Sequence, residues 1–258
     1  SDLTGQWVNY DGHRSLFESR SQNRKGLLMW MSHSCWPSMV WQTYDYYFEP
    51  TAAYFAIKKA SEPLHIQWNP ATDEVEVVNY SAGTHKGLTA KVQVLNMDAS
   101  VAWEKEATVD SNEDTTDKCI KLEFPENLSK VHFIKMTLTE DGKVVSDNFY
   151  HRSLEENNYQ DLCQLAKVAL QSATTVDKNA DGTWSAVSVI ENKTSTPALM
   201  IRLNVVDGKD DQQILPVFYS DNYFSLLPGE KKEVRMSWRD EDTRGNEGKV
   251  LITGYNVE

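Results

Sequence analysis

Seven short runs of alternating apolar and polar residues fill the stretch from residue 65 to residue 151: HIQW (65–68), EVEVVNY (74–80), LTAKVQVLNM (88–97), VAWEKEATV (101–109), CIKLEF (119–124), VHFIKMTLT (131–139) and VVSDNFYH (144–151). This alternation suits strands with one buried face, because successive side chains of a strand point to opposite sides of its sheet. Turn residues, such as Glu-Asp-Gly at 140–142, separate the runs. Seven short strands at this spacing predict an immunoglobulin-like β-sandwich.

A second series of strand-like runs follows: TWSAVSVIENKT (183–194), ALMIRLNVVD (198–207), ILPVFYSDNYFSLLPGE (214–230), KKEVRMSWRD (231–240) and KVLITGYNVE (249–258). The same succession of strands and polar turns predicts a second sandwich. Between the two series, residues 154–168 have a brief helical pattern, which predicts a linker helix.

The first sixty residues have a different pattern. Apolar residues recur at helical spacing from Leu3 to Arg20, and further helical pieces are expected over residues 38–47 and 51–60, interrupted at Pro50. Between them, residues 26–50 (GLLMWMSHSCWPSMVWQTYDYYFEP) contain three tryptophans and three tyrosines. We expect Leu27–Trp30 to form a buried strand that opens into a loop of polar and aromatic residues.

One strand between two helices cannot bury both faces of a parallel sheet. The N-terminal segment is therefore expected either to dock on the sandwiches or to be the last helix-strand-helix unit of a β/α barrel. We predict a mainly β chain in three parts. Residues 1–62 are the C-terminal piece of a β/α barrel, residues 63–153 are one immunoglobulin-like sandwich, and residues 154–258 are a second sandwich with a short linker helix.

Composition excludes several classes of partner. The formal net charge of −12 disfavours a nucleic acid, since phosphate binding needs a cationic surface. No apolar stretch approaches the roughly 18 residues of a membrane helix, so no membrane partner is expected. The three cysteines are widely separated, which argues against a disulfide framework and against a metal site.

Three tripeptides fit the N-glycosylation pattern, at Asn79, Asn127 and Asn192, and we expect surface turns to explain them.

The run YFAIKKASEPLHIQW (54–68), with the aromatic stretch before it, resembles a junction in glycoside hydrolase family 2, where the barrel of β-mannosidases and exo-β-glucosaminidases passes into the first C-terminal sandwich. SDNYFSLLPGEKKEV (220–234) and VLITGYN (250–256) resemble the last sandwich of the same enzymes. The resemblance implies a retaining exo-glycosidase without a cofactor that removes a terminal β-linked sugar of the mannoside or glucosaminide type. It also suggests a secreted or periplasmic protein.

The two catalytic glutamates of that family match no residue of this chain. Retaining glycosidases need two carboxyl groups about 5 to 5.5 Å apart. Glu18 lies in the first predicted helix and Glu49 lies after the aromatic loop, so neither is assigned a catalytic role. We expect a fragment that is inactive alone, with the rest of the barrel domain as its partner and the terminal β-linked sugar of an oligosaccharide as the substrate of the parent.

Three residues of the aromatic loop are expected to contact that sugar. Trp36 matches the barrel tryptophan of the family, which implies that its ring forms the floor of the terminal-sugar subsite, although a ring that only packs the loop is the alternative. His33 and Ser34 stand where the related enzymes place polar residues near sugar hydroxyls. The family often has Asn in this neighbourhood, so the sugar specificity is left open, and a satisfied loop histidine is the alternative for His33.

A second function remains open from sequence, that of a noncatalytic glycan-binding or adhesion protein made of sandwich domains. In such a protein exposed tryptophan rings would hold the glycan. The alternation along the strands instead predicts that the sandwich tryptophans fill the cores: Trp68, Trp103, Trp184 and Trp238.

Overall fold

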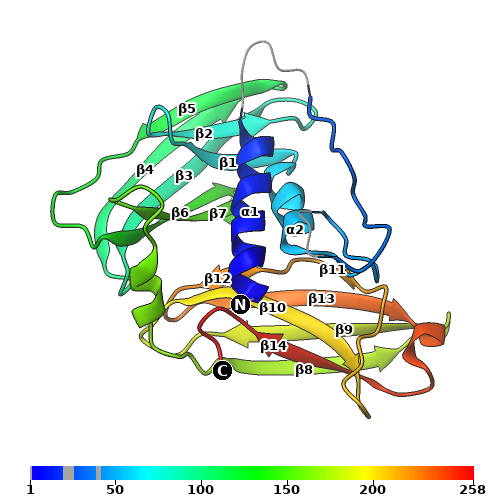
Figure 1. Ribbon diagram of the computed structural model, residues 1–258. Helices are drawn as coiled ribbons and strands as arrows, with labels where there is room; N and C mark the ends of the chain where they lie inside the picture. The colour runs from blue at the N-terminus through cyan, green and yellow to red at the C-terminus, as the bar shows by residue number, and fades with distance from the viewer. Residues whose placement is uncertain (1, 20–25, 39–41) are drawn as a thin grey trace. The chain divides into compact units, whose positions relative to one another are not determined.

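The computed structural model describes residues 2–19, 26–38 and 42–258 (Figure 1). Packing divides these residues into two compact units. One unit comprises residues 15–19 and 57–165, and the other comprises residues 2–14, 26–38, 42–56 and 166–258. The three-part division at residues 62/63 and 153/154 stays a prediction.

The first sandwich consists of two antiparallel sheets, in the strand orders β1-β2-β5 and β4-β3-β6-β7. Seven strands are present in this region, as predicted: β1 (Leu64–Asn69), β2 (Glu74–Asn79), β3 (His85–Asn96), β4 (Val101–Ser111), β5 (Thr115–Lys121), β6 (Val131–Glu140) and β7 (Lys143–Ser153) (Figure 1). Six of them lie close to their predicted bounds, whereas β5 shares only residues 119–121 with the strand predicted over 119–124. On β3, Leu88, Ala90, Val92 and Val94 are buried while the residues between them are more exposed. The sequence alternation thus marks the face that meets the other sheet.

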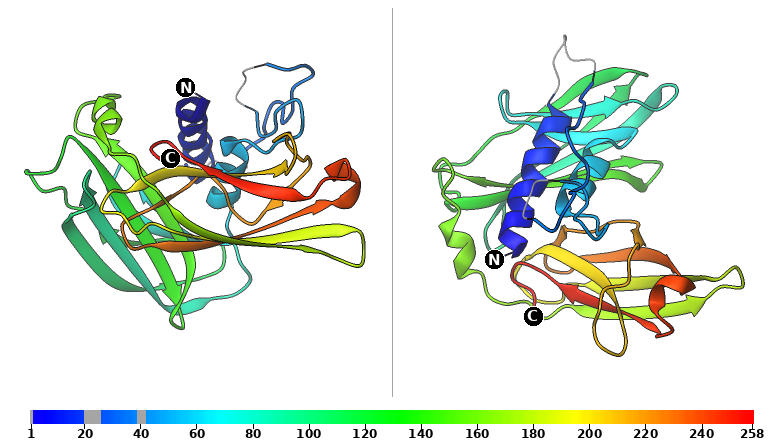
Figure 2. Two further views of the ribbon diagram at one scale, coloured as in Figure 1. Left: turned by 90° about the horizontal axis from the view of Figure 1, so that it is seen from below. Right: turned by 45° about the vertical axis from the view of Figure 1, so that its right-hand side comes forward.

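The second sandwich has sheets in the orders β12-β10-β14 and β11-β13-β9-β8 (Figure 2). Its strands are β8 (Gln171–Lys178), β9 (Thr183–Glu191), β10 (Ala198–Asp207), β11 (Phe218–Tyr219), β12 (Phe224–Leu226), β13 (Lys231–Arg239) and β14 (Gly248–Thr253). Trp238 is buried at its centre, where a Cβ atom on Gly248 would lie 2.8 Å from the indole. The other three sandwich tryptophans pack against the cores, so their expected role is confirmed.

Two of the helices predicted from sequence are present as expected, and a third is shorter. Helix α1 (Asp2–Glu18) and helix α2 (Ala52–Ala60) lie where they were predicted. The linker helix of residues 154–168 is shorter than expected, a single 3₁₀ turn over Gln160–Gln164 that buries Leu162. A further 3₁₀ turn, Asp240–Thr243, follows β13.

The buried strand expected at Leu27–Trp30 is wrong. These residues form no strand, and Leu28 and Trp30 are 98% and 84% exposed. A strand needs neighbours for its backbone N–H and C=O groups, and no described strand pairs with this segment. Four apolar residues in a row are therefore not sufficient here to form a buried strand.

The helix expected over residues 38–47 is also wrong for the part that the structure describes, residues 38 and 42–47; residues 39–41 lie outside the described residues. Asp45 folds the backbone back on itself instead, because its Oδ1 atom accepts hydrogen bonds from the backbone N–H of Tyr47 at 2.8 Å and of Glu49 at 2.9 Å. Aspartate commonly closes turns in this way, in competition with a helix.

Asn79 closes a turn at the end of β2. Its Nδ2 atom donates to the backbone oxygens of Gly83 at 3.1 Å and Ser111 at 3.3 Å. Its Oδ1 atom accepts from the Ser81 hydroxyl at 2.5 Å. Asn79 is fully buried, so its side chain is not at the surface.

Asn192 has the same arrangement in the second sandwich. Its Nδ2 atom donates to the backbone oxygens of Thr196 at 2.8 Å and Leu226 at 3.0 Å, and its Oδ1 atom accepts from the Thr194 hydroxyl at 2.8 Å. It is fully buried as well. The Asn-X-Ser/Thr pattern is thus explained by a turn whose hydroxyl bonds to the asparagine, while only the third such asparagine, Asn127, is exposed.

We expect Asn192→Ala to lower the free energy of unfolding by about 2 kcal/mol, because it removes the hydrogen bonds from Nδ2 to the backbone carbonyls of Thr196 and Leu226 inside the protein. Urea unfolding followed by circular dichroism measures the change. Asn127→Ala is the matched control, since it changes an exposed residue of the same tripeptide pattern and should stay within about 0.5 kcal/mol. Equal effects of the two substitutions would contradict the structural role of Asn192.

Candidate functional site

The candidate site is the aromatic segment, which we define as residues 26–38 and 42–50. The two parts of this segment are joined at Ser32, whose backbone oxygen accepts hydrogen bonds from the Tyr44 N–H and from the Thr43 hydroxyl, both at 2.9 Å. An isolated parallel bridge joins His33 to Tyr44. The loop that carries the predicted sugar contacts is therefore tied to the residues before α2.

His33 is held in a fixed orientation. Its ring stacks on Phe48 with a centroid distance of 4.3 Å and an interplanar angle of 15°. Its Nε2 atom lies 3.2 Å from the backbone oxygen of Tyr46. Phe48 adopts a left-handed backbone conformation (φ 67°), which is costly for a residue with a Cβ atom and is frequent at functional sites.

Ser34 and Trp36 follow His33 but have different environments. Ser34 is buried, and its Oγ atom has no hydrogen-bond partner among the described residues. Trp36 is 68% exposed, so most of its indole is accessible. Its location next to Pro37 fits a ring presented to a ligand, and the structure places all three predicted site residues on one four-residue stretch.

The C-terminal end of the aromatic segment is anchored to the second sandwich. The Glu49 carboxylate pairs with the Arg202 guanidinium of β10 and accepts from Gln213 Nε2 at 2.7 Å. Phe55 of α2 packs edge-on against Tyr219, with ring centroids 6.3 Å apart. These contacts anchor the segment to the second sandwich.

Sequence reasoning missed a pocket beside this anchor. Tyr47, Gln213, Leu215 and Arg244 line an open pocket of about 360 Å³. Arg244 donates from Nη2 to the Gln213 backbone oxygen at 3.0 Å. The lining residues come from three distant parts of the chain, and no sequence pattern connects them.

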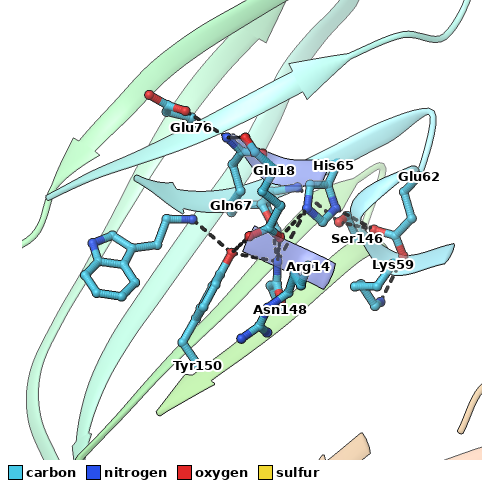
Figure 3. Close-up of polar contacts among 12 residues, drawn as sticks. Arg14, Glu18, Lys59, Glu62, His65, Gln67, Glu76, Ser146, Asn148 and Tyr150 are labelled. Atoms are coloured by element: carbon cyan, nitrogen blue, oxygen red, sulfur yellow. Dashed lines mark hydrogen bonds and ion pairs between the residues drawn. The ribbon is translucent and has the colours of Figure 1, made fainter. Parts of the chain in front are cut away.

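The two carboxylates considered from sequence are both occupied. Glu49 accepts from Arg202 and Gln213, as described above. Both oxygens of Glu18 accept hydrogen bonds from buried groups of the first sandwich (Figure 3). Neither side chain offers an unengaged carboxylate oxygen of the kind that a glycosidase uses.

Other chemistry is limited in the described part of the chain. No group of three or more His, Cys, Asp or Glu side chains there is placed to hold a metal ion. Burial raises the pKa of the Cys119 thiol to about 11, so this thiol is not a nucleophile at neutral pH. None of the described helices is long and apolar enough to cross a membrane.

Two family models match the chain, and together they cover most of both sandwiches. The mannosidase Ig/CBM-like domain matches residues 73–153, and the exo-β-D-glucosaminidase Ig-fold domain matches residues 148–257. The chain carries the immunoglobulin-like domains of the exo-β-D-glucosaminidase and mannosidase families of glycoside hydrolases. The family resemblance and the mainly β fold inferred from sequence are thereby confirmed.

Relatives of the glucosaminidase family extend this match over nearly the whole chain. The exo-β-D-glucosaminidase of Streptomyces avermitilis is 31% identical over 98% of this chain and 31% of its own length. That of Amycolatopsis orientalis is 32% identical over 98% of this chain and 27% of its own length. The chain thus spans about a third of the length of the relatives that it matches.

Solved structures agree. The exo-chitosanase of Amycolatopsis orientalis superimposes with a TM-score of 0.90 at 29% identity, over 98% of this chain and 33% of that chain. The β-D-mannosidase of Dictyoglomus thermophilum, at 17% identity and a TM-score of 0.68, shows the fold alone. The N-terminal segment and both sandwiches of this chain therefore have a counterpart in that exo-chitosanase.

Proposed function

We propose that this chain is the C-terminal part of a retaining exo-β-glycosidase, and that the whole enzyme hydrolyses a terminal β-linked sugar of the glucosaminide or mannoside type. The observation that supports this most is the aromatic segment, an exposed set of rings anchored on a sandwich that matches exo-β-D-glucosaminidases. Hydrolysis with retention needs two carboxyl groups and no cofactor. We propose that both are supplied by the rest of the enzyme, and that this chain is inactive alone.

In this proposal Trp36 forms the floor of the terminal-sugar subsite. Its accessible indole face suits the CH-rich face of a sugar ring. His33 donates from Nε2 to the Tyr46 carbonyl, which leaves Nδ1 of the neutral ring as an acceptor for a sugar hydroxyl. The Ser34 hydroxyl lies one residue further along, is buried, and has no hydrogen-bond partner among the described residues; we propose that the bound sugar supplies that partner.

The remaining apolar residues of the aromatic segment are proposed to contact the barrel. Leu28, Trp30 and Met31 expose large apolar surfaces, and a soluble protein usually covers such a patch in its working assembly. The related glucosaminidases are about three times as long as this chain. The rest of the same polypeptide is therefore the proposed cover.

We expect Trp36→Ala, in the full-length polypeptide that contains this chain, to lower kcat/KM for an aryl β-D-glucosaminide by at least about tenfold, because the lost stacking contact is worth about 1.4 kcal/mol or more. Trp36→Phe should restore part of the activity. Phe218→Ala, which removes an exposed ring of the second sandwich, is the control and should leave kcat/KM unchanged.

The alternative function, a noncatalytic glycan-binding protein, is supported by the same exposed rings of Trp30 and Trp36. It makes a different prediction for the isolated chain. Saturable binding of a glucosamine oligomer to the chain alone, lost in Trp36→Ala, together with wild-type hydrolysis by the full-length variant, would favour the alternative. Hydrolysis by the chain alone would contradict both proposals.

A further inference from the structure

A fully buried histidine lies between two carboxylates in the first sandwich. His65 is on β1, and its Nε2 atom lies 2.9 Å from Glu18 Oε1 at the end of α1. Its Nδ1 atom lies 3.0 Å from Glu62 Oε2, just before β1 (Figure 3). A neutral imidazole has one N–H group and cannot donate to both.

The other groups hydrogen-bonded to Glu18 are donors, as suits an ionised carboxylate. Asn148 Nδ2 donates to Oε1 at 2.8 Å, and the Tyr150 hydroxyl lies 2.8 Å from Oε2. The Tyr150 oxygen itself accepts from Asn148 Nδ2 at 2.9 Å and from the backbone N–H of Trp68 at 3.2 Å. Its own proton is therefore directed at Glu18, which acts only as an acceptor.

The same reasoning applies to Glu62. Its Oε2 atom accepts from the Ser146 hydroxyl at 2.7 Å, and its Oε1 atom accepts from Lys59 Nζ at 2.8 Å. Lys59 also pairs with Asp147 at 2.7 Å. Burial raises the pKa of Glu62, but the hydrogen bonds from His65, Lys59 and Ser146 outweigh burial, so that the pKa is lowered.

We propose that His65 is a buried imidazolium that latches the last turn of α1 to the first sandwich, and that deprotonation of the ring at alkaline pH releases this turn. Between two ionised carboxylates, only the doubly protonated ring satisfies both contacts. Burial opposes the charged ring, yet the hydrogen bonds to Glu18 and Glu62 and the charges of these residues raise the pKa of His65 above its ordinary value.

The latch acts on the last turn of α1 through the Glu18 carboxylate. A carboxylate at a helix C-terminus is disfavoured by the helix dipole, and the last turn of α1 contains no basic residue. Arg14, one turn before Glu18, is paired with Asp11 at 2.9 Å. Glu76 on β2 is hydrogen-bonded to Gln67 at 2.9 Å, and no hydrogen bond joins it to the imidazole among the described contacts.

The direction of the pH dependence follows from these shifts. The latch contributes its full stabilisation through His65 below about pH 6.5, where the ring is charged in both states, and loses it as the pH rises through the raised folded-state pKa. On the acid side, the contribution of Glu62 is lost as the pH falls through its lowered pKa. The latch is closed between these two values.

A titration of the chain by NMR tests the proposal without any substitution. We expect the His65 ring to titrate with a midpoint above the 6.5 of an unperturbed histidine, and both ring nitrogens to be protonated below that midpoint. The hydrogen-exchange protection of the amides of residues 15–18, corrected for the intrinsic rate, should fall as the pH rises through the midpoint. The total fall should be about tenfold for each pH unit by which the midpoint exceeds 6.5. A neutral ring at about pH 6, or protection that stays constant up to about pH 10, would overturn the proposal.

A variant pair separates the latch from a general pH effect. Glu18→Gln keeps the shape of the side chain and offers an N–H to a neutral ring, so it should lower the His65 midpoint and reduce the pH dependence of the protection, while Glu62 keeps its share. Glu140→Gln removes the carboxylate that lies 2.7 Å from His85 in the same sandwich, and should change neither. Equal responses of the two variants would contradict the assignment to Glu18.

Discussion

Replacement of Phe55 by alanine is expected to lower the free energy of unfolding by about 3–5 kcal/mol, the usual cost of removing a buried aromatic ring. Phe55 is 1% exposed and extends from α2 toward the second sandwich. Its ring centroid lies 6.3 Å from that of Tyr219 and 5.8 Å from that of Tyr223. Two rigid rings cannot close the space that the substitution leaves, so the cavity persists.

Urea unfolding at a fixed pH measures this change through the midpoint and slope. Phe218→Ala is the matched control, because it makes the same chemical change at a ring that is 69% exposed, and it should stay within about 0.5 kcal/mol. Similar midpoints for the two variants would show that the packing of α2 on the second sandwich contributes little to stability.

Arg202→Ala is expected to destabilise the same unit by about 3 kcal/mol. The substitution leaves the Glu49 carboxylate mostly buried without its cation, and the removal of one partner from a buried pair costs about 3–5 kcal/mol. We take the lower end because Gln213 Nε2 continues to donate to Glu49. The aromatic segment, which ends at this contact, should then be cleaved more rapidly in limited proteolysis.

A double-mutant cycle isolates the pair from other effects of the substitution. Glu49→Ala combined with Arg202→Ala should cost less than the sum of the single substitutions, since the second removes a charge that the first left unpaired. Arg202→Lys keeps the charge but not the guanidinium fork, and should recover only part of the stability. Strict additivity would mean that the two residues contribute independently.

The sandwiches could be predicted from sequence because burial is encoded locally. On β3, every second residue from Leu88 to Val94 faces the opposite sheet, and the resulting alternation is visible in the sequence itself. Strand β8 was not predicted, since nearly all of its residues are exposed on both faces and QSATTVDK has no apolar face to detect. Its place in the sheet comes from pairing with β9 alone.

The aromatic segment could be identified from sequence as a candidate functional segment, but its backbone structure could not be predicted from its residue pattern. The apolar run 27–30 has the composition of a buried strand, but none of the strands that the structure describes pairs with it. The sugar contacts at His33, Ser34 and Trp36 came from the family resemblance and stay a proposal. The surroundings of His65 could not be inferred, because Glu18 is 47 residues away from it along the chain and Asn148 is 83.

The two buried asparagines that close turns in the sandwiches bear on how this protein can be produced. A eukaryotic secretory pathway attaches oligosaccharides to Asn-X-Ser/Thr before folding is complete, and a glycan on Asn79 or Asn192 would place a bulky polar group in the protein interior. Each modification would also consume an N–H that a backbone carbonyl needs. Hosts without this transferase are therefore the suitable choice for recombinant expression.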